Sequence, residues 1–196
     1  MTLDALIQRI AEAASGPGRV LVALAGPPAS GKSTLSTTLA ERAGGAVLPM
    51  DGFHLDDRLL GPMGLLARKG APETFDLGGL ARTLDALRAG ADVYHPIFDR
   101  SREIAIAAAG RIPAETRVVV CEGNWLLLDR PGWRDLAWDV TARLEVPDRV
   151  LRRRLERRWA ALEPDARAAK IDGNDLPNAR LVREESRPAE FVLKDR

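Results

Sequence analysis

Short, continuous apolar runs recur along this chain and have the length of β-strands. The first extends from Arg19 to Ala25 (RVLVALA). A run without polar alternation is typical of a parallel strand that is covered on both faces. We expect further strands at 46–50, 117–121 and 140–144, and a last strand near 191–193.

Most intervals between these runs show the helical spacing of apolar residues. Leu77, Leu80, Leu84 and Leu87, for example, fall on one face of a predicted helix. Similar patterns predict a helix that starts at Leu3, helices over 34–43 and 147–162, and a helical stretch beyond the loop at 172–178. Strands that alternate with helices indicate an α/β fold with a mostly parallel sheet.

Some segments do not follow this alternation. Residues 56–75 carry glycine, proline and the basic pair Arg68–Lys69 without a clear period, so we expect a long irregular insertion. Residues 91–98 are extended at best, because Pro96 argues against a central strand, and 104–109 could form a short helix or strand. Because no repeat or linker divides the sequence, we expect a single domain over residues 1–196.

Composition narrows the possible partners. The 29 basic and 28 acidic side chains nearly cancel, which gives no argument for nucleic acid or a membrane as partner. The single cysteine, Cys121, is expected to be a buried core thiol. We find no apolar run of membrane-spanning length and no secretion-signal pattern, so we expect a cytoplasmic protein, either a monomer or a homodimer.

The segment Gly26–Ser33 (GPPASGKS) matches the phosphate-binding pattern G-x-x-x-x-G-K-[ST] and stands between a predicted strand and a predicted helix. The glycines allow a tight turn against phosphate oxygens, and N–H groups at the helix start face the anion. Lys32 adds a positive charge, and the Ser33 hydroxyl is a ligand for Mg²⁺. The residues expected to bind the nucleotide are Gly26, Pro27, Ala29, Ser30, Gly31, Lys32, Ser33 and Thr34.

Two acidic residues, Asp51 and Glu122, directly follow predicted strands. Ligands of an open parallel sheet lie beyond the carboxyl ends of its strands, so we expect both side chains near the transferred phosphoryl group. We assign Asp51 as the base that accepts the proton of a hydroxyl, and Glu122 as the carboxylate on the Mg²⁺ side. The reverse assignment stays open, and either carboxylate could instead be a helix cap or turn residue.

Five closely spaced arginines stand in the predicted helix after Pro147: Arg152, Arg153, Arg154, Arg157 and Arg158. Arg154 and Arg157, three residues apart, share one face, whereas Leu151 and Leu155 share the face that packs. Such dense positive charge repels itself unless an anion lies near, which a lid over nucleotide phosphates (about 148–171) would provide. We therefore assign Arg154 and Arg157 to catalysis; the alternative is a solvated basic surface.

Candidates for an acceptor pocket come from the segments around these motifs. His54 lies three residues after Asp51, and neither histidine has the i,i+4 partner of a zinc helix. Arg68 and its neighbour Lys69 could bind an anionic acceptor. The side chains expected to line the pocket are Phe53, His54, Arg68, His95, Phe98 and Arg102, although core packing or surface exposure would also account for individual members.

Together these segments resemble the P-loop kinases that include uridine kinase, phosphoribulokinase and bacterial pantothenate kinase. The resemblance rests on GPPASGKST, MDGFHLDD, HPIFDRSRE, VVVCEGNWLLLD and LRRRLERRW, and it covers most of the chain. MDGFH is similar to the TDGF segment of pantothenate kinases, and PIFDRSRE to the P-x-Y-D segment of uridine kinases. The chain most resembles a bacterial branch labelled as fructose-transport-system or nucleoside/nucleotide kinase-like proteins.

This resemblance implies a P-loop NTPase fold, with a five-stranded parallel sheet between two helical layers and a basic lid helix. It implies ATP and Mg²⁺, Asp51 as the catalytic aspartate, Glu122 as the Walker-B-like acid, and a loop over 174–178, with Asn178, beside the adenine. Asn/Asp/Pro runs such as this loop are also ordinary turn formers. Two departures limit the resemblance: Phe98 stands where uridine kinases carry tyrosine, and residues 56–75 replace their long hairpin insertion.

We therefore predict an ATP-dependent kinase that transfers the γ-phosphoryl group to a hydroxyl of a small metabolite, such as a sugar, a nucleoside or pantothenate. A P-loop GTPase is less favoured, because Gly173-Asn174-Asp175 lacks the lysine of a guanine-reading N-K-x-D segment. An ATP-binding regulatory module without acceptor turnover is the other alternative, although the intact Lys32 and Ser33 weigh against it.

Overall fold

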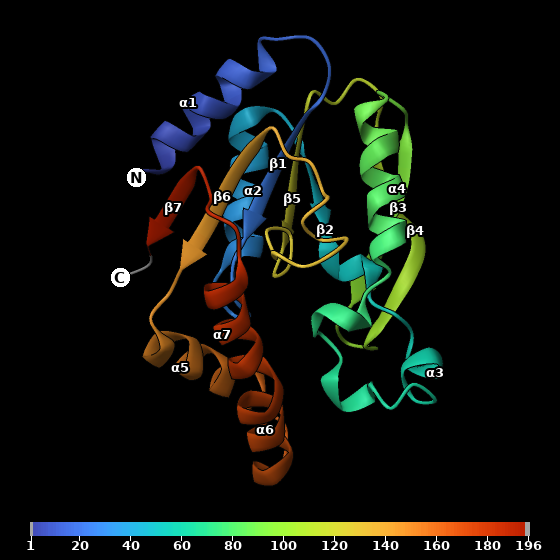
Figure 1. Cartoon of the computed structure of the whole chain (residues 1–196), viewed down its shortest axis with the longest axis vertical. Coiled ribbons are helices and arrows are strands. Elements are labelled where there is room, and N and C mark those ends of the chain that lie inside the picture. The colour runs from blue at the N-terminus through green and yellow to red at the C-terminus, as the bar shows by residue number, and fades with distance from the viewer. Residues whose placement is uncertain (1, 195–196) are drawn as a thin grey trace.

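A five-stranded sheet forms the centre of the molecule in the computed structural model, which describes residues 2–194 (Figure 1). Its strands lie in the order β2-β5-β1-β6-β7, and every neighbouring pair is parallel. The predicted α/β fold with a parallel five-stranded sheet is therefore confirmed. The bounds of the strands are β1 (Val20–Ala25), β2 (Ala46–Pro49), β5 (Val118–Gly123), β6 (Val140–Glu145) and β7 (Phe191–Lys194).

Helices cover both faces of this sheet, because alternate residues of each central strand point to opposite sides. Leu21 and Ala23 of β1 pack into a core with Leu80 and Leu84 of α4. Val22, the residue between them, packs into a second core with α1 and α2. This two-sided burial explains the continuous apolar run of β1. The main helices are α1 (Leu3–Ala14), α2 (Lys32–Ala43), α4 (Leu77–Arg88), α5 (Asp148–Arg158), α6 (Pro164–Lys170) and α7 (Leu176–Glu185).

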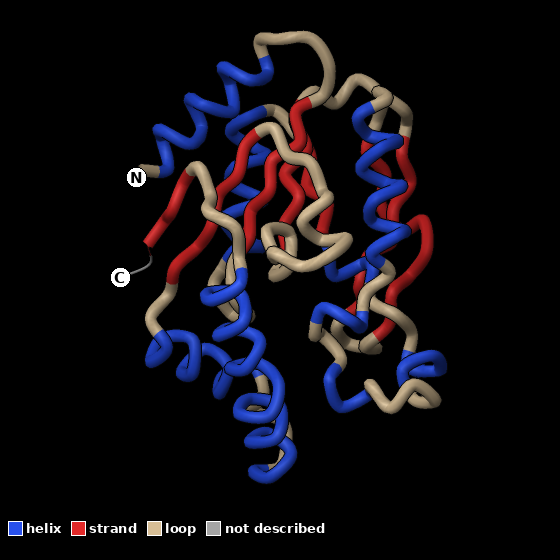
Figure 2. Tube along the Cα trace, viewed as in Figure 1, coloured by secondary structure: helices blue, strands red, loops and turns tan. Residues whose placement is uncertain are grey.

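An antiparallel hairpin of β3 (Val93–Asp99) and β4 (Ile104–Ile112) lies beside the central sheet (Figure 2). The expectation that 91–98 is extended but not a central strand is thus confirmed, and residues 104–109, for which helix and strand were both left open, form part of strand β4. Pro96 falls at the register shift between His95 and Ile97. Both strands of a two-stranded ribbon are edge strands, so the missing N–H of proline is tolerated there.

The insertion (residues 56–75) is irregular, as predicted. It contains only short turns: α3 (Asp57–Leu60), η2 (Leu66–Arg68) and η3 (Pro72–Thr74).

The predicted helix over 147–162 is wrong in its length. The chain leaves the helical conformation at Trp159 (φ −100°, ψ 16°), and Pro164 opens α6. The predicted loop at 172–178 is also wrong, because a π-helical turn, η4 (Ile171–Asp175), joins α6 to α7.

The burial of Cys121 gives a first prediction. Its side chain is 1% exposed in the core, and this burial raises the pKa of the thiol far above its usual range. We expect the native protein not to react with a thiol-specific disulfide reagent, and the unfolded protein in guanidinium to react with one thiol per chain. Rapid labelling of the native protein, at the rate measured in guanidinium, would contradict this burial.

Candidate active site

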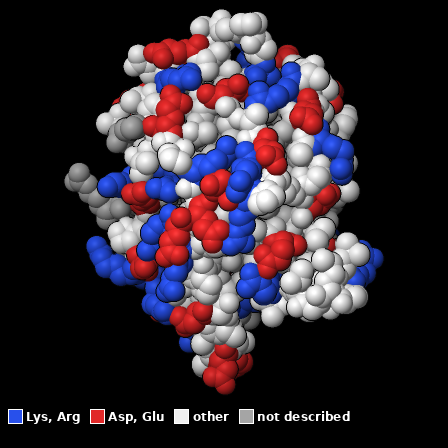
Figure 3. Space-filling view, viewed as in Figure 1, with Lys and Arg blue, Asp and Glu red and all other residues white. Residues whose placement is uncertain are grey.

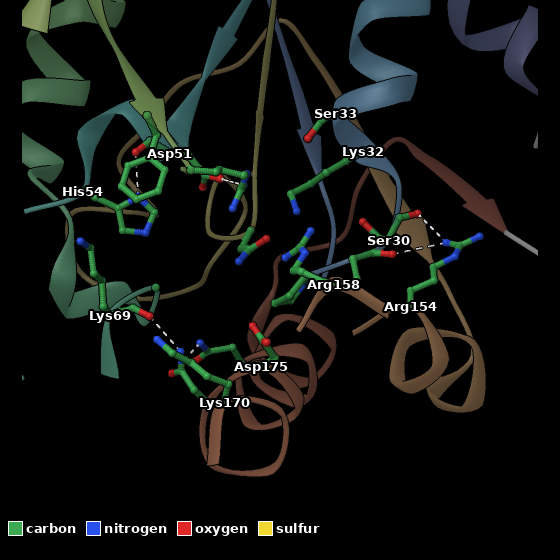
Figure 4. A pocket seen from close by; sticks show the side chains of 18 of the residues that line it. Ser30, Lys32, Ser33, Asp51, His54, Lys69, Arg154, Arg158, Lys170 and Asp175 are labelled. Carbon is green, nitrogen blue, oxygen red and sulfur yellow. Dashed lines mark hydrogen bonds and ion pairs between the residues drawn. The ribbon is translucent and has the colours of Figure 1, made fainter. Parts of the chain in front are cut away.

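The turn between β1 and α2 forms one wall of a cleft (Figure 4). Ala29 (φ 60°) and Gly31 (φ 91°) both adopt the left-handed backbone conformation. The Lys32 ammonium donates a hydrogen bond to the Pro27 carbonyl at 3.2 Å, which closes the turn. No side chain within the described residues caps α2, so the helix presents its first N–H groups to a ligand.

Glu122 lies beside this turn because β5 pairs with β1. Its side chain is buried, and Oε1 accepts a hydrogen bond from the Ser33 hydroxyl at 3.2 Å. Burial raises the pKa of Glu122, Lys32 opposes this shift, and the nearby Asp51 adds to it.

The Ser33–Glu122 pair fits one side of a Mg²⁺ site. Mg²⁺ in phosphoryl-transfer sites takes one or two protein oxygens and completes its octahedron with phosphates and water. No cluster of three or more His, Cys, Asp or Glu side chains suited to a metal occurs between residues 2 and 194. The two oxygens of Ser33 and Glu122 therefore suit an ion that arrives with a nucleotide, rather than one held by protein ligands alone.

A 3₁₀ turn after β2, η1 (Met50–Phe53), positions Asp51 and His54. Residues three apart eclipse each other in this geometry, so Asp51 and His54 both line the cleft. The His54 Nδ1 lies 2.7 Å from the Asp51 carbonyl oxygen. The imidazole packs against the rings of Phe75 and Phe98, with centroids 4.1 and 4.6 Å away.

Arg100, at the tip of the hairpin, forms an ion pair with the Asp51 carboxylate. Burial acts to raise the pKa of Asp51, but the positive charges of Arg100, His54 and Lys32 outweigh it and hold that pKa below its usual value. Asp51 and Glu122 are therefore shifted in opposite directions, although both lie near Lys32.

The predicted lid reaches the cleft through Arg154 and Arg158. Arg154 donates a hydrogen bond to the Ser30 carbonyl at 3.1 Å. Arg158 lies one helical turn further on the same face and lines the cleft, where burial acts to lower its pKa. Arg157, which was assigned to catalysis with Arg154, does not line the cleft. Four residues advance about 400° around an α-helix, and three residues advance about 300°. In α5 the two arginines that face the cleft, Arg154 and Arg158, are four residues apart.

The π-helical turn η4 closes the lower side of the cleft. Asn174, Asp175 and Asn178 line it. The Trp159 indole donates to the Asp175 carboxylate at 2.7 Å, and burial raises the pKa of that carboxylate. The Asn174 amide donates to the Lys69 carbonyl at 2.8 Å, which joins η4 to the insertion. π-Turns of this kind are frequent at functional sites.

Most of the predicted site residues meet in this cleft. Those that line it are Ala29, Ser30, Gly31, Lys32, Ser33, Thr34, Asp51, His54, Phe98, Arg154 and Asn178. Gly26 and Pro27 lie at the base of the turn instead. A Cβ at Gly26 would lie 2.9 Å from the Ser30 hydroxyl and 3.1 Å from the Leu144 Cβ, so a larger residue here would require both neighbours to shift.

Four predicted acceptor residues lie outside the cleft. Phe53 is in the core, 5% exposed. His95 is 4% exposed, and its ring fills the space that a side chain at Gly110 would occupy. Arg68 pairs with Glu73 at 2.6 Å on the exposed surface, and Arg102 is exposed beyond the hairpin tip.

Several cleft residues were not among the predicted site residues. Arg158 could have been found from the i,i+4 spacing with Arg154. Lys69 was considered beside Arg68 as a possible anion-binding residue, and of these two neighbours it is Lys69 that lines the cleft. The remaining residues carry no sequence signal, because distant segments bring them together. They are Gly70, Phe75, Arg100, Glu103, Asn124, Trp159 and Lys170. Pro28, in contrast, belongs to the predicted phosphate-binding turn, and Asn174 and Asp175 belong to the segment 174–178 that was expected beside the adenine.

The distribution of charged side chains on the outer surface differs from that in the cleft. On the face that Figure 3 shows, Lys and Arg side chains intermingle with Asp and Glu side chains. None of the helices in residues 2–194 is both long and apolar enough to span a membrane.

Comparison with known proteins shows to which family the chain belongs. No family model matches the chain. It is 34% identical over 212 residues to "Putative uridine kinase C227.14" of Schizosaccharomyces pombe, across 97% of this chain and 89% of that protein. YggC of Escherichia coli is 36% identical over 187 residues, across 90% of this chain and 78% of YggC. The chain belongs to the P-loop kinase group.

Solved structures agree with this assignment. The crystal structure of a "putative fructose transport system kinase" from Silicibacter sp. TM1040 superposes with a TM-score of 0.92 and 53% identity, and it covers 98% of this P-loop kinase and 99% of that chain. Phosphoribulokinase from Rhodobacter spheroides, with a TM-score of 0.54 and 13% identity, shares the fold alone. The predicted kinase group is thus confirmed, and the chain is an ATP-binding kinase of this group.

Gly52 of this P-loop kinase lies where η1 meets the hairpin, next to Asp51. A Cβ at Gly52 would lie 2.7 Å from the Pro96 carbonyl carbon, so a side chain would force η1 and β3 apart. We expect Gly52→Ala to lower the free energy of unfolding by about 1–3 kcal/mol in urea titrations. Gly173→Ala is the control, because no atom lies within 4 Å of its added Cβ. Equal stability of the two variants would show that this close approach is not a constraint.

Proposed function

We propose that this P-loop kinase transfers the γ-phosphoryl group of ATP to a hydroxyl of a small metabolite. The observation that carries the proposal is the arrangement in one cleft, of about 330 Å³, of the phosphate-binding turn and a separate carboxylate, Asp51. The turn alone supports nucleotide binding. Asp51, on the opposite wall beside aromatic side chains, supports an acceptor whose proton must be removed.

Cationic side chains on the nucleotide side suit a triphosphate. Lys32 comes from the turn, and Arg154 and Arg158 come from α5 above it. These charges would stabilise the phosphate oxygens as the phosphoryl group moves. Ser33 and Glu122 would hold Mg²⁺, which neutralises charge on the β- and γ-phosphates when it is bound. Asn178 is assigned to the nucleotide side; its amide donates to the Asn174 side chain at 3.2 Å in the cleft wall.

Asp51 is the better candidate for the base, because the Ser33 hydroxyl ties Glu122 to the metal side. The acceptor oxygen bonds to the γ-phosphorus while the bond from that phosphorus to the β–γ bridging oxygen breaks. The hydroxyl proton passes to Asp51, and ADP leaves. The lowered pKa keeps Asp51 ionised at neutral pH, so that it is ready to accept this proton.

Asp51→Asn tests the base. The substitution keeps the size of the side chain and removes its basicity, so we expect acceptor-dependent ADP formation to fall about 10²–10⁴-fold, with ATP binding retained. ADP formation would be followed over a panel of nucleosides, pantothenate, ketoses and ribulose phosphate, and ATP binding by calorimetry.

Asp92→Asn provides a matched control for this test. Asp92 also pairs with an arginine of the hairpin, Arg111 at 2.7 Å, but lies outside the cleft. It should keep full activity. A full rate for Asp51→Asn would refute the base assignment. ATP binding without turnover for every acceptor would favour the regulatory-module alternative.

Glu122→Gln tests the metal side separately. The amide cannot supply the carboxylate charge, so we expect the Mg²⁺ concentration for half-maximal turnover to rise about tenfold or more. An unchanged Mg²⁺ requirement, together with a lost rate, would instead support the reverse assignment of the two carboxylates.

A further inference from the structure

The cleft holds more positive charge than a nucleotide on its turn explains. Three of its cationic side chains, Lys32, Arg154 and Arg158, lie on the nucleotide side. Three more enter from other elements: Lys69 from the insertion, Arg100 from the hairpin and Lys170 from α6. The acidic side chains that line the cleft are fewer, namely Asp51, Glu103 and Asp175.

Lys69 and Arg100 lie together on the acceptor side. Both approach the ring of Phe98, with the Lys69 ammonium 5.4 Å and the Arg100 guanidinium carbon 5.9 Å from its centroid. Lys69 is a fixed charge, since its side chain is 8% exposed and its ammonium donates to Asp57 and to the Glu103 carbonyl, each at 2.6 Å. An ammonium has three hydrogens, and these two bonds use two of them.

Arg100 is held far less firmly. Its side chain is 57% exposed, and its recorded partner is Asp51, the proposed base. Exposed ion pairs contribute little stability, whereas a guanidinium binds a phosphate or carboxylate group through two parallel hydrogen bonds. While Arg100 holds an Asp51 oxygen, that carboxylate is a weaker base for a hydroxyl. An acceptor that offers Arg100 another anion would release Asp51.

We propose that the acceptor carries an anionic group, a phosphate monoester or a carboxylate, which Lys69 and Arg100 bind while its hydroxyl faces Asp51. The inference rests on the proposed function and specifies its substrate class. Phe98, Phe75 and His54 form an aromatic wall beside these cations that suits a short carbon skeleton. Binding transfers Arg100 from Asp51 to the acceptor, so that an anionic acceptor also frees the base. A neutral acceptor leaves Arg100 on Asp51.

Matched pairs of compounds test this inference. The wild-type enzyme would be assayed with ribulose and ribulose 5-phosphate, pantothenol and pantothenate, and glycerol and glycerate, each with Mg²⁺ and ATP. We expect turnover of an anionic member with kcat/KM at least about tenfold above that of its neutral partner, as one charge-assisted hydrogen bond predicts. The phosphate and carboxylate pairs distinguish the two kinds of anion.

Arg100→Gln separates recognition from a merely structural role. For the anionic acceptor we expect KM to rise about 10–100-fold. For its neutral partner we expect an unchanged or higher rate, because Asp51 is no longer paired. Arg111→Gln, on the same hairpin but outside the cleft, should change neither. Lys69→Gln should also raise KM for the anionic acceptor, with a melting temperature checked against wild type, since Lys69 also joins the insertion to the hairpin.

Three results would overturn the inference without affecting the proposed kinase function: preference for a neutral member of a pair, equal use of both members, or an equal loss of activity with both members in Arg100→Gln.

If no compound is phosphorylated, the proposed function fails on this panel, and a binding measurement tests the inference separately. Calorimetry with the protein loaded with Mg²⁺ and a non-hydrolysable ATP analogue should then detect an anionic compound, with affinity lost in Arg100→Gln. Absence of such binding overturns the inference.

Discussion

β5 pairs in parallel with β1 on one side and with β2 on the other, and the arrangement of the cleft depends on this pairing. In the register of the sheet, Glu122 lies opposite Leu24 of β1 and Pro49 of β2. The phosphate-binding turn, Glu122 and η1 therefore leave the sheet at the same level. Parallel pairing of this kind requires strands that are buried on both faces, which the two cores on either side of β1 provide.

The acceptor side of the cleft is built differently. Its walls come from the insertion, the hairpin and η4, and polar contacts join these three segments. Asn174 donates to the Lys69 carbonyl at 2.8 Å, and the Lys69 ammonium donates to the Glu103 carbonyl at 2.6 Å. Contacts of this type open at a lower free-energy cost than a packed core. The nucleotide side is thus anchored on the sheet, while the acceptor side depends on a few hydrogen bonds between distant segments.

The two carboxylates, Asp51 and Glu122, lie in different environments, which shift their pKa values in opposite directions. Glu122 is buried beside Ser33, and this burial raises its pKa. Asp51 is half-buried, and it faces Arg100 and His54, whose positive charge outweighs the effect of this burial and lowers its pKa. Two carboxylates with pKa values shifted apart are suited to different roles. Because the Arg100 side chain is 57% exposed, its ion pair with Asp51 is readily exchanged for another anion.

The sheet, the phosphate-binding turn and the two carboxylates at strand ends can all be predicted from the amino-acid sequence. Continuous apolar runs reflect burial on both faces of a strand, and the turn GPPASGKS needs its residues in consecutive positions. That Arg100 lines the cleft while His95 and Arg102 do not is apparent only from the folded structure. These placements depend on how the hairpin, the insertion and η4 pack across more than one segment of the chain. No local pattern encodes such contacts, because each side chain is compatible with either a surface or a cleft position until its neighbours are known.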